Sequence, residues 1–113
     1  MNRIYPITVA SGLTGKEGTF FKIVNGVPTP VAAATDAPSG CLDHYLSDTK
    51  GGLALEGAAT RVKVSAAVKQ FSFGKLDAAG TASAFAGAEG EVRVCQFLQD
   101  GAADEFVNAI IIL

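Results

Sequence analysis

Hydrophobic and polar residues alternate in short stretches along this chain, and Gly, Pro, Asp or Asn interrupts the pattern after roughly every eight to twelve residues. Val62 and Val64, for example, would lie on one face of a strand, with Arg61 and Lys63 on the other. No stretch repeats its apolar residues at helical spacing. The pattern therefore predicts an all-β fold, a small β-sandwich or β-barrel of short antiparallel strands.

Ten segments carry this strand pattern. They comprise residues 3–9, 19–24, 27–33, 40–46, 52–56, 61–65, 68–73, 81–86, 91–98 and 105–113. The last segment ends in four consecutive large apolar residues, 110–113, which predicts a strand buried on both faces, either inside the domain or across a subunit contact.

Asn25 and Gly26 separate two of these segments. Both central residues of a type I′ turn need positive φ angles, which Asn and Gly adopt at the least cost, so a tight hairpin is predicted. The return strand contains Pro28 and Pro30, which have no N–H group to donate. We therefore expect that strand at the edge of a sheet.

Pro6 interrupts the N-terminal segment in the same way, and Gly12, Gly15 and Gly18 follow it. Residues 1–18 are therefore expected to form either an edge strand or an extended N-terminal arm, with a glycine-rich connection. Residues 19–113 are expected to form a single β domain.

A weak internal repeat separates several residues by 52 to 54 positions. The matching pairs are Phe20 with Phe73, Lys22 with Lys75, Gly26 with Gly80, Cys41 with Cys95, and Asp48 with Asp100. Two similar β halves packed on each other are one interpretation. Chance matches among Ala- and Gly-rich segments are the other.

The chain has 113 residues and a net charge of −2, and its nine Lys and Arg residues form no cluster. Nucleic-acid-binding proteins usually carry a basic stripe, so no nucleic-acid partner is expected. No apolar stretch is long enough to cross a bilayer, and the apolar run at residues 4–10 is too short for the core of a signal peptide. We expect no membrane partner and an intracellular product.

Side chains suited to catalysis are few. His44 is the single histidine, and Cys41 precedes it by three positions, so in a strand the two would point to opposite faces. Cys41, His44 and Asp48 leave a metal site incomplete. We therefore expect no catalytic residue, no metal and no cofactor, and hence no enzyme. Cys41 and Cys95 are expected to be buried small hydrophobic residues, with the question whether they meet left open.

Residues 15–113 resemble the head decoration, or cement, proteins of tailed bacteriophages. The resemblance lies in "GTFFKIVNGVPTPVAAATDAPSG", a strand, turn and strand with an "ATDAP-G" connection, and in "GAATRVKVSAAVKQFSFGKLDAAGTASA", where a "VKV" strand leads into a second such unit. It is a likeness of pattern, and "CLDHYLSD" has no place in it.

The resemblance implies a non-enzymatic virion protein that binds the outer surface of the phage capsid and stabilises contacts between major capsid protein subunits. It further implies a homo-oligomer, with a trimer favoured, made in the host cytoplasm and located on the capsid surface. Relatives use a terminal arm to contact the capsid, which would correspond here to the segment with Arg3, Ile4, Tyr5, Ile7 and Val9.

Two other classes of function stay open. One is a small β-rich adhesin, tail or pilus-like assembly subunit, and the other is a small enzyme or a β-barrel that binds a metal or ligand. A pocket lined by Cys41, His44 and several carboxylates would favour the second of these classes.

Overall fold

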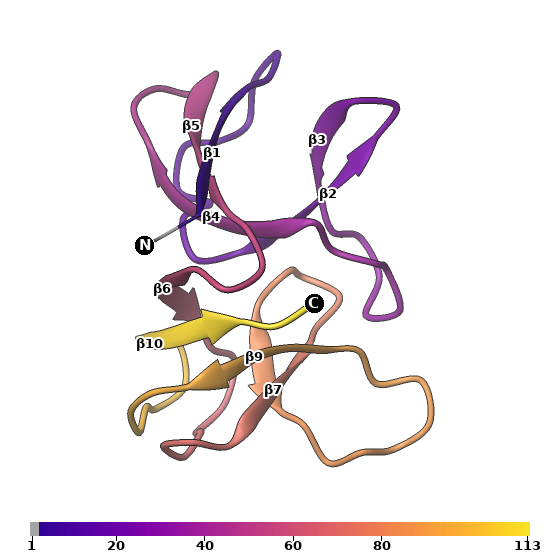
Figure 1. The fold of residues 1–113 in the computed structure, drawn as a ribbon, viewed down its shortest axis with the longest axis vertical. Helices are drawn as coiled ribbons and strands as arrows, with labels where there is room; N and C mark the ends of the chain where they lie inside the picture. Colours follow the sequence, from indigo (N-terminus) through magenta and orange to yellow (C-terminus); the bar gives the residue numbers. More distant parts are fainter. Residues whose placement is uncertain (1–2) are drawn as a thin grey trace.

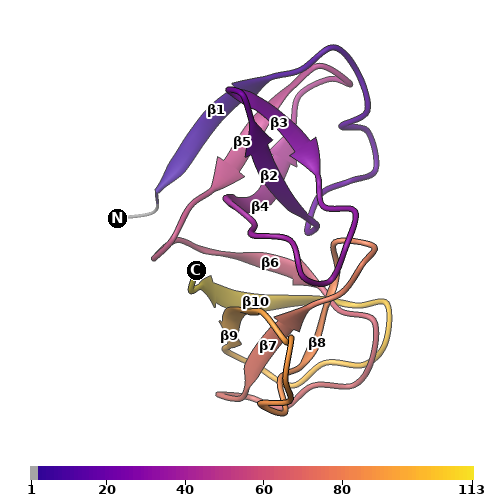
Figure 2. The same ribbon diagram turned by 90° about the vertical axis from the view of Figure 1, so that its right-hand side faces the viewer.

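The computed structural model describes residues 3–113 and consists of ten strands in two five-stranded antiparallel sheets. The two sheets form the upper and lower halves of the molecule in Figures 1 and 2. The first sheet contains β1 (Ile4–Thr8), β2 (Phe20–Val24), β3 (Val27–Pro30), β4 (Gly40–Tyr45) and β5 (Lys50–Ala54). The second contains β6 (Ala59–Lys63), β7 (Phe73–Leu76), β8 (Ala82–Ala84), β9 (Arg93–Phe97) and β10 (Phe106–Ile111). The predicted all-β fold is confirmed.

The two sheets have the same strand order. The first runs β1, β5, β4, β2, β3, and the second runs β6, β10, β9, β7, β8, so each strand of the second sheet corresponds to the strand five earlier in the chain. The molecule is therefore built from two similar halves, as one interpretation of the sequence repeat proposed.

The strand register corrects one part of that repeat. Cys41 lies opposite Phe20, whereas Gln96 lies opposite Phe73, so Gln96 rather than Cys95 occupies the position that corresponds to Cys41. A shift of one residue moves a side chain to the other face of a sheet. The match between the two cysteines in the sequence is therefore not a structural equivalence.

Both hairpins of the repeat have the expected turn glycines. Asn25 and Gly26 have φ angles of 50° and 79°, and Val24 pairs directly with Val27, as the predicted two-residue turn requires. In the second half Asp77 N donates to Thr81 O at 2.9 Å, and Gly80 has a φ angle of 85°, which closes a three-residue loop.

Three strand predictions were wrong in detail. The segment at 68–73 is a connection, because Val68 pairs with Gly101 and Ser72 Oγ donates to Lys69 O, and β7 begins only at Phe73. Segment 27–33 ends as a strand at Pro30. Within one chain the C-terminal strand is fully buried on one face only, since Ala109 and Ile111 are inaccessible while Ile110 and Ile112 are half-buried. This excludes burial of both faces inside the domain and leaves the subunit contact as a prediction.

Two clusters of buried hydrophobic side chains form the core of the molecule. The first-half core comprises Ile7, Leu13, Phe21, Leu42 and Leu53. The central core joins the halves, since it packs Phe20 and Cys41 of the first sheet with Val62, Leu76 and Phe97 of the second. Its members are almost all below 5% exposed, so the two sheets form one packed unit.

Candidate interaction surface

Residues 4–8 form edge strand β1, which pairs along its whole length with β5. Arg3 O accepts a hydrogen bond from Leu55 N at 2.8 Å, and Val9 N donates to Thr49 O at 2.9 Å. Ile7 is only 5% exposed and belongs to the first-half core. Of the two alternatives for this segment, the structure shows the edge strand and no free arm over residues 3–9, because β5 and the core hold it in place.

The backbone of β1 leaves an interrupted edge toward solvent. Because Arg3 and Val9 bond to β5, the backbone groups of Ile4, Pro6 and Thr8 face the open side. Pro6 has no N–H group, so the middle of this edge lacks a donor. The edge is therefore poorly suited to accept another strand.

The other edge of the first sheet has the same property. Val24 and Val27 are paired at a two-residue turn, so Pro28 and Pro30 of β3 direct their backbone away from β2. The second sheet instead joins its own edges, because Ser65 N donates to Ala82 O at 3.0 Å and Val64 pairs with Ala82. The predicted edge position of both proline strands is confirmed.

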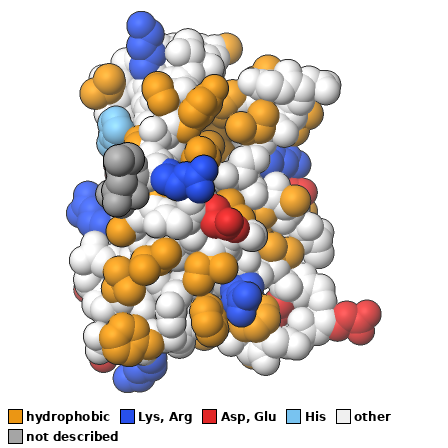
Figure 3. Space-filling view, viewed as in Figure 1, with side chains coloured by type: hydrophobic (Ala, Val, Ile, Leu, Met, Phe, Trp, Pro, Cys, Tyr) orange, Lys and Arg blue, Asp and Glu red, His pale blue; other side chains and the backbone are white. Residues whose placement is uncertain are grey.

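Exposed large apolar side chains are concentrated in the first half. They comprise Tyr5, Ile23, Val24, Val27, Tyr45 and Leu46, with Phe71 and Leu113 in the second half. Figure 3 shows apolar side chains over both halves of one face, with charged groups dispersed among them. Of these residues, only Tyr5 lies in the segment predicted from the sequence to contact a partner. The exposure of Val24 and Val27 could have been inferred from their places beside the predicted turn, where little of the chain is available to cover a side chain.

His44 lies in a shallow depression of about 260 Å³ together with Glu17, Asp43, Tyr45 and Arg61. Burial raises the pKa of the Asp43 carboxyl, but hydrogen bonds from Thr60 Oγ1 at 2.6 Å and with His44 Nδ1 at 2.9 Å outweigh it and lower the pKa. Glu17 Oε2 is buried without a hydrogen-bond partner among the described residues. Asp43 thus links His44 to Thr60 at the start of the second half.

Cys41 takes no part in this group. It is inaccessible to solvent, and burial, followed by the charges of Cys95 and Asp43, raises the pKa of its thiol well above the usual value. His44 Nδ1 is hydrogen-bonded to Asp43 Oδ2 and not to the Cys41 thiol. Cys41 therefore remains a neutral thiol in the central core, as expected of a buried small hydrophobic residue.

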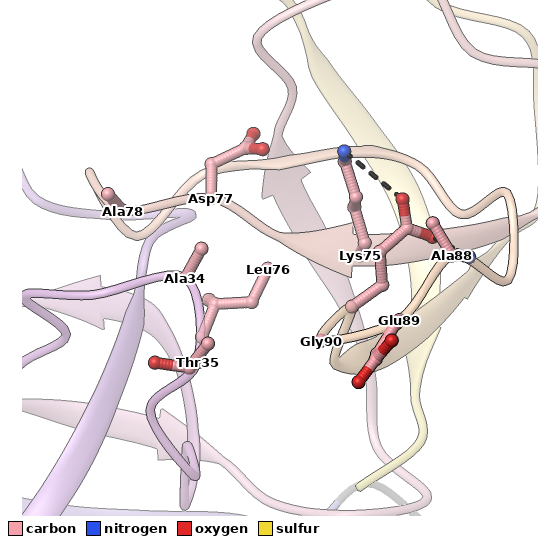
Figure 4. A pocket seen from close by; sticks show the side chains of 10 residues that line it. Ala34, Thr35, Lys75, Leu76, Asp77, Ala78, Ala88, Glu89 and Gly90 are labelled. Carbon is pink, nitrogen blue, oxygen red and sulfur yellow. Dashed lines mark hydrogen bonds and ion pairs between the residues drawn. The ribbon is translucent and has the colours of Figure 1, made fainter.

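A larger cavity of about 410 Å³ lies between the halves, with Ala34 and Thr35 of the β3–β4 connection on one side (Figure 4). Across it, Lys75 Nζ lies 3.4 Å from Glu91 Oε2. The amides of Ala86 and Gly87 donate to Glu91 Oε1 at 2.8 and 2.9 Å, and Ala88 N does so at 3.3 Å. The Ala86 bond is the main reason that the pKa of Glu91 is lowered. Glu91 therefore organises the β8–β9 connection.

Asp36 has the corresponding role in the first half. Its Oδ2 accepts hydrogen bonds from Ala32 N at 2.9 Å and Ala33 N at 3.0 Å, and Lys22 Nζ lies 3.1 Å away. The bond from Ala32 contributes most to the lowered pKa of this carboxyl. Lys22 and Lys75 thus bind an acidic residue of the following connection in both halves, which confirms their match in the sequence repeat.

Residues 3–113 contain no group of three or more His, Cys, Asp and Glu side chains placed to hold a metal ion. Within the same residues, no helix is long and apolar enough to cross a membrane. No family model matches the sequence, and no curated protein matches it significantly.

Proposed function

We propose that this chain is a non-enzymatic structural protein that binds the outer surface of a bacteriophage capsid and stabilises contacts between major capsid protein subunits. The observation that carries the proposal is the concentration of exposed apolar side chains on the first half. Leu46 is 80% exposed and Tyr5 is 54% exposed. Tyr5 lies on β1 and Leu46 directly follows β4, and the first-half core holds both strands in place through Ile7 and Leu42. Aromatic and aliphatic side chains on a rigid scaffold are typical anchors of protein interfaces.

Several carboxylates of the chain bind backbone amides of its own connections, which supports a structural rather than a catalytic role. Asp36 and Glu91 each bind backbone amides of a connection, and Asp48 does the same through Gly12 N at 3.0 Å and Thr14 N at 3.1 Å. These carboxylates are committed to loop structure. The resemblance to head decoration proteins gives the capsid as the partner.

Within this proposal the capsid contact is made by Tyr5 on β1, by Tyr45 at the end of β4 and by Leu46 in the turn that follows. Arg3 and Tyr5 are the exposed members of the predicted arm. Ile7 is buried, and Ile4 and Val9 are half-buried, so their side chains hold β1 rather than meet a partner. A capsid subunit would bury the side chains of Tyr5, Tyr45 and Leu46. It would not add a strand to β1, because Pro6 interrupts that edge.

The test is co-sedimentation with emptied heads of the phage or prophage that encodes the chain. The wild-type protein should pellet with the heads and saturate them. Leu46→Asp should weaken binding at least about tenfold, the effect of losing a buried apolar anchor. Ser47→Asp, at the next exposed position of the same turn, adds the same single negative charge and should bind like the wild type. A protein that stays in the supernatant at every concentration contradicts the proposal.

A further inference from the structure

A row of side chains crosses each sheet at the same place and on the same face. In the first half the row is Ala54, Cys41 and Phe20, on β5, β4 and β2. In the second half the corresponding row is Ile110, Gln96 and Phe73, on β10, β9 and β7. The two rows differ in what covers them.

The first-half row is completely buried by the second half. Ala54, Cys41 and Phe20 are all 0% exposed and belong to the central core. The second hairpin, β7–β8, reaches this row through its turn, where Gly80 O accepts a hydrogen bond from Phe20 N at 2.8 Å. Leu76, near the tip of the same hairpin, is 1% exposed and packs in the same core as Phe20.

The second-half row is less completely covered, and on Phe73 lies the guanidinium of Arg93 from the same sheet, with Cζ 4.7 Å from the ring centroid. Ile110, Gln96 and Phe73 are all half-buried, and Gln96 Nε2 donates to Phe71 O at 3.0 Å, which places Phe71 beside the row. The Phe71 side chain is 63% exposed. These four residues, Phe71, Phe73, Gln96 and Ile110, are called the outer face below.

The tip of the first hairpin, β2–β3, is likewise exposed. Ile23 corresponds to Leu76 in the paired hairpins, yet it is 42% exposed. Val24 and Val27, which flank the turn, are 47% and 55% exposed, and nothing lies within 4 Å of a Cβ placed on Gly26. Ile23, Val24 and Val27 are called the hairpin tip.

Phe71 also has an unusual backbone. Its φ angle is 67°, a left-handed conformation that is costly for a large side chain. Phe71 N donates to Phe97 O at 2.7 Å, and Gln96 holds the Phe71 carbonyl. The surrounding bonds therefore maintain a strained residue whose ring points into solvent, an arrangement found where a side chain is presented to a partner.

We propose that the partner is a second copy of this chain, with the hairpin tip of one copy packed on the outer face of the next. The contact repeats between copies the arrangement that the second hairpin and the first-half row adopt within one copy. It is heterologous, so copies join head to tail and form a ring where the rotation closes. The proposal concerns self-association and does not depend on capsid binding.

Sedimentation velocity of the purified chain over a wide range of concentration provides the first test. The wild type should show a mass that rises with concentration or a discrete oligomer. A tip variant, Val24→Lys with Val27→Lys, and a face variant, Phe71→Gly, should each associate about tenfold or more weakly. Leu46→Lys, an exposed apolar position outside both surfaces, should associate like the wild type. A wild type that stays monomeric at every concentration overturns the proposal.

Mixing the two variants is the sharper test. The tip variant keeps its outer face and the face variant keeps its hairpin tip, so the mixture should form a one-to-one dimer although neither variant self-associates. A mixture that stays monomeric, with both variants folded by circular dichroism, overturns the head-to-tail contact. Capsid co-sedimentation of the same variants separates the two proposals, since loss of self-association need not remove capsid binding.

Discussion

Gly80 O accepts a hydrogen bond from Phe20 N at 2.8 Å, and this bond joins the turn of the second hairpin to the first strand of the first hairpin. A Cβ on Gly80 would lie 3.3 Å from Phe20 O. The backbone conformation of Gly80 and the packing of the two halves are thus coupled through the contact with Phe20.

Gly80→Ala should therefore destabilise the protein more than an equivalent change elsewhere. Gly90 has nearly the same φ angle, 83° against 85°, but nothing lies within 4 Å of its Cβ position. Gly90→Ala should cost about 1 kcal/mol through backbone strain alone. Gly80→Ala should cost more, since the methyl group also meets Phe20 O. Urea unfolding of both variants gives the comparison, and equal losses would contradict the coupling.

Restoring the missing donor on the edge of β1 should promote aggregation. Pro6→Thr supplies an N–H group toward solvent and a residue that favours strands. We expect faster formation of large aggregates that bind a cross-β dye. Pro38→Thr, in a connection outside the strands, serves as the control and should behave like the wild type. Aggregation at the wild-type rate would show that Pro6 does not protect this edge.

Stability should fall in acid because several carboxyl groups have lowered pKa values in the folded state. Hydrogen bonds from Ala32, Gly12 and Ala86 are the main causes for Asp36, Asp48 and Glu91, respectively. A carboxyl with a lowered folded pKa stabilises the protein above its unfolded pKa, here 3.8 for Asp and 4.5 for Glu, and this contribution is lost as the pH falls through the folded value.

The free energy of unfolding should therefore be nearly constant from neutral pH to about pH 5 and decrease below it. Asp48→Asn should reduce this dependence, because it removes one of the groups that must be protonated. Unfolding by urea between pH 7 and pH 3 measures both effects. A variant whose pH dependence matches the wild type would show that Asp48 does not contribute.

The two thiols should be unreactive in the folded protein. Burial raises the pKa of Cys95 to about 12 and that of Cys41 well above its usual value, so little thiolate exists at neutral pH. A colorimetric thiol reagent should detect neither group in buffer and both in denaturant. Cys41→Ser should lower the free energy of unfolding by about 1–3 kcal/mol, because it buries a hydroxyl without a hydrogen-bond partner. Cys41→Val adds side-chain volume without a polar group, so comparing the two variants separates the effect of volume from that of polarity. Rapid labelling of the native protein would contradict this burial.

The fold followed from the sequence where local chemistry decides the structure. Asn25 and Gly26 specified a turn through their φ angles, and Pro6, Pro28 and Pro30 specified edges because they lack a donor. The match of Lys22 with Lys75 reflects equivalent ion pairs in the two halves, Lys22 with Asp36 and Lys75 with Glu91. The match of Cys41 with Cys95 was wrong, because the two cysteines differ by one residue in strand register. The number of residues between them in the sequence does not reveal such a shift.

The candidate surfaces could be predicted only in part. Tyr5 was singled out, but the exposure of Ile23 and the burial of Leu76 at equivalent positions depend on how the halves pack. The same holds for Ile7, whose burial depends on Leu13 and Leu53. Such differences between repeated positions arise from tertiary contacts, which alternation along a strand does not specify.

Electron cryomicroscopy of emptied heads incubated with the purified chain tests the central claim most directly. The account predicts added density on the outer surface, at contacts between major capsid protein subunits, into which the two five-stranded sheets fit with Tyr5 and Leu46 toward the shell. Heads that show no added density at saturating protein, or density confined to the inner surface, would contradict it.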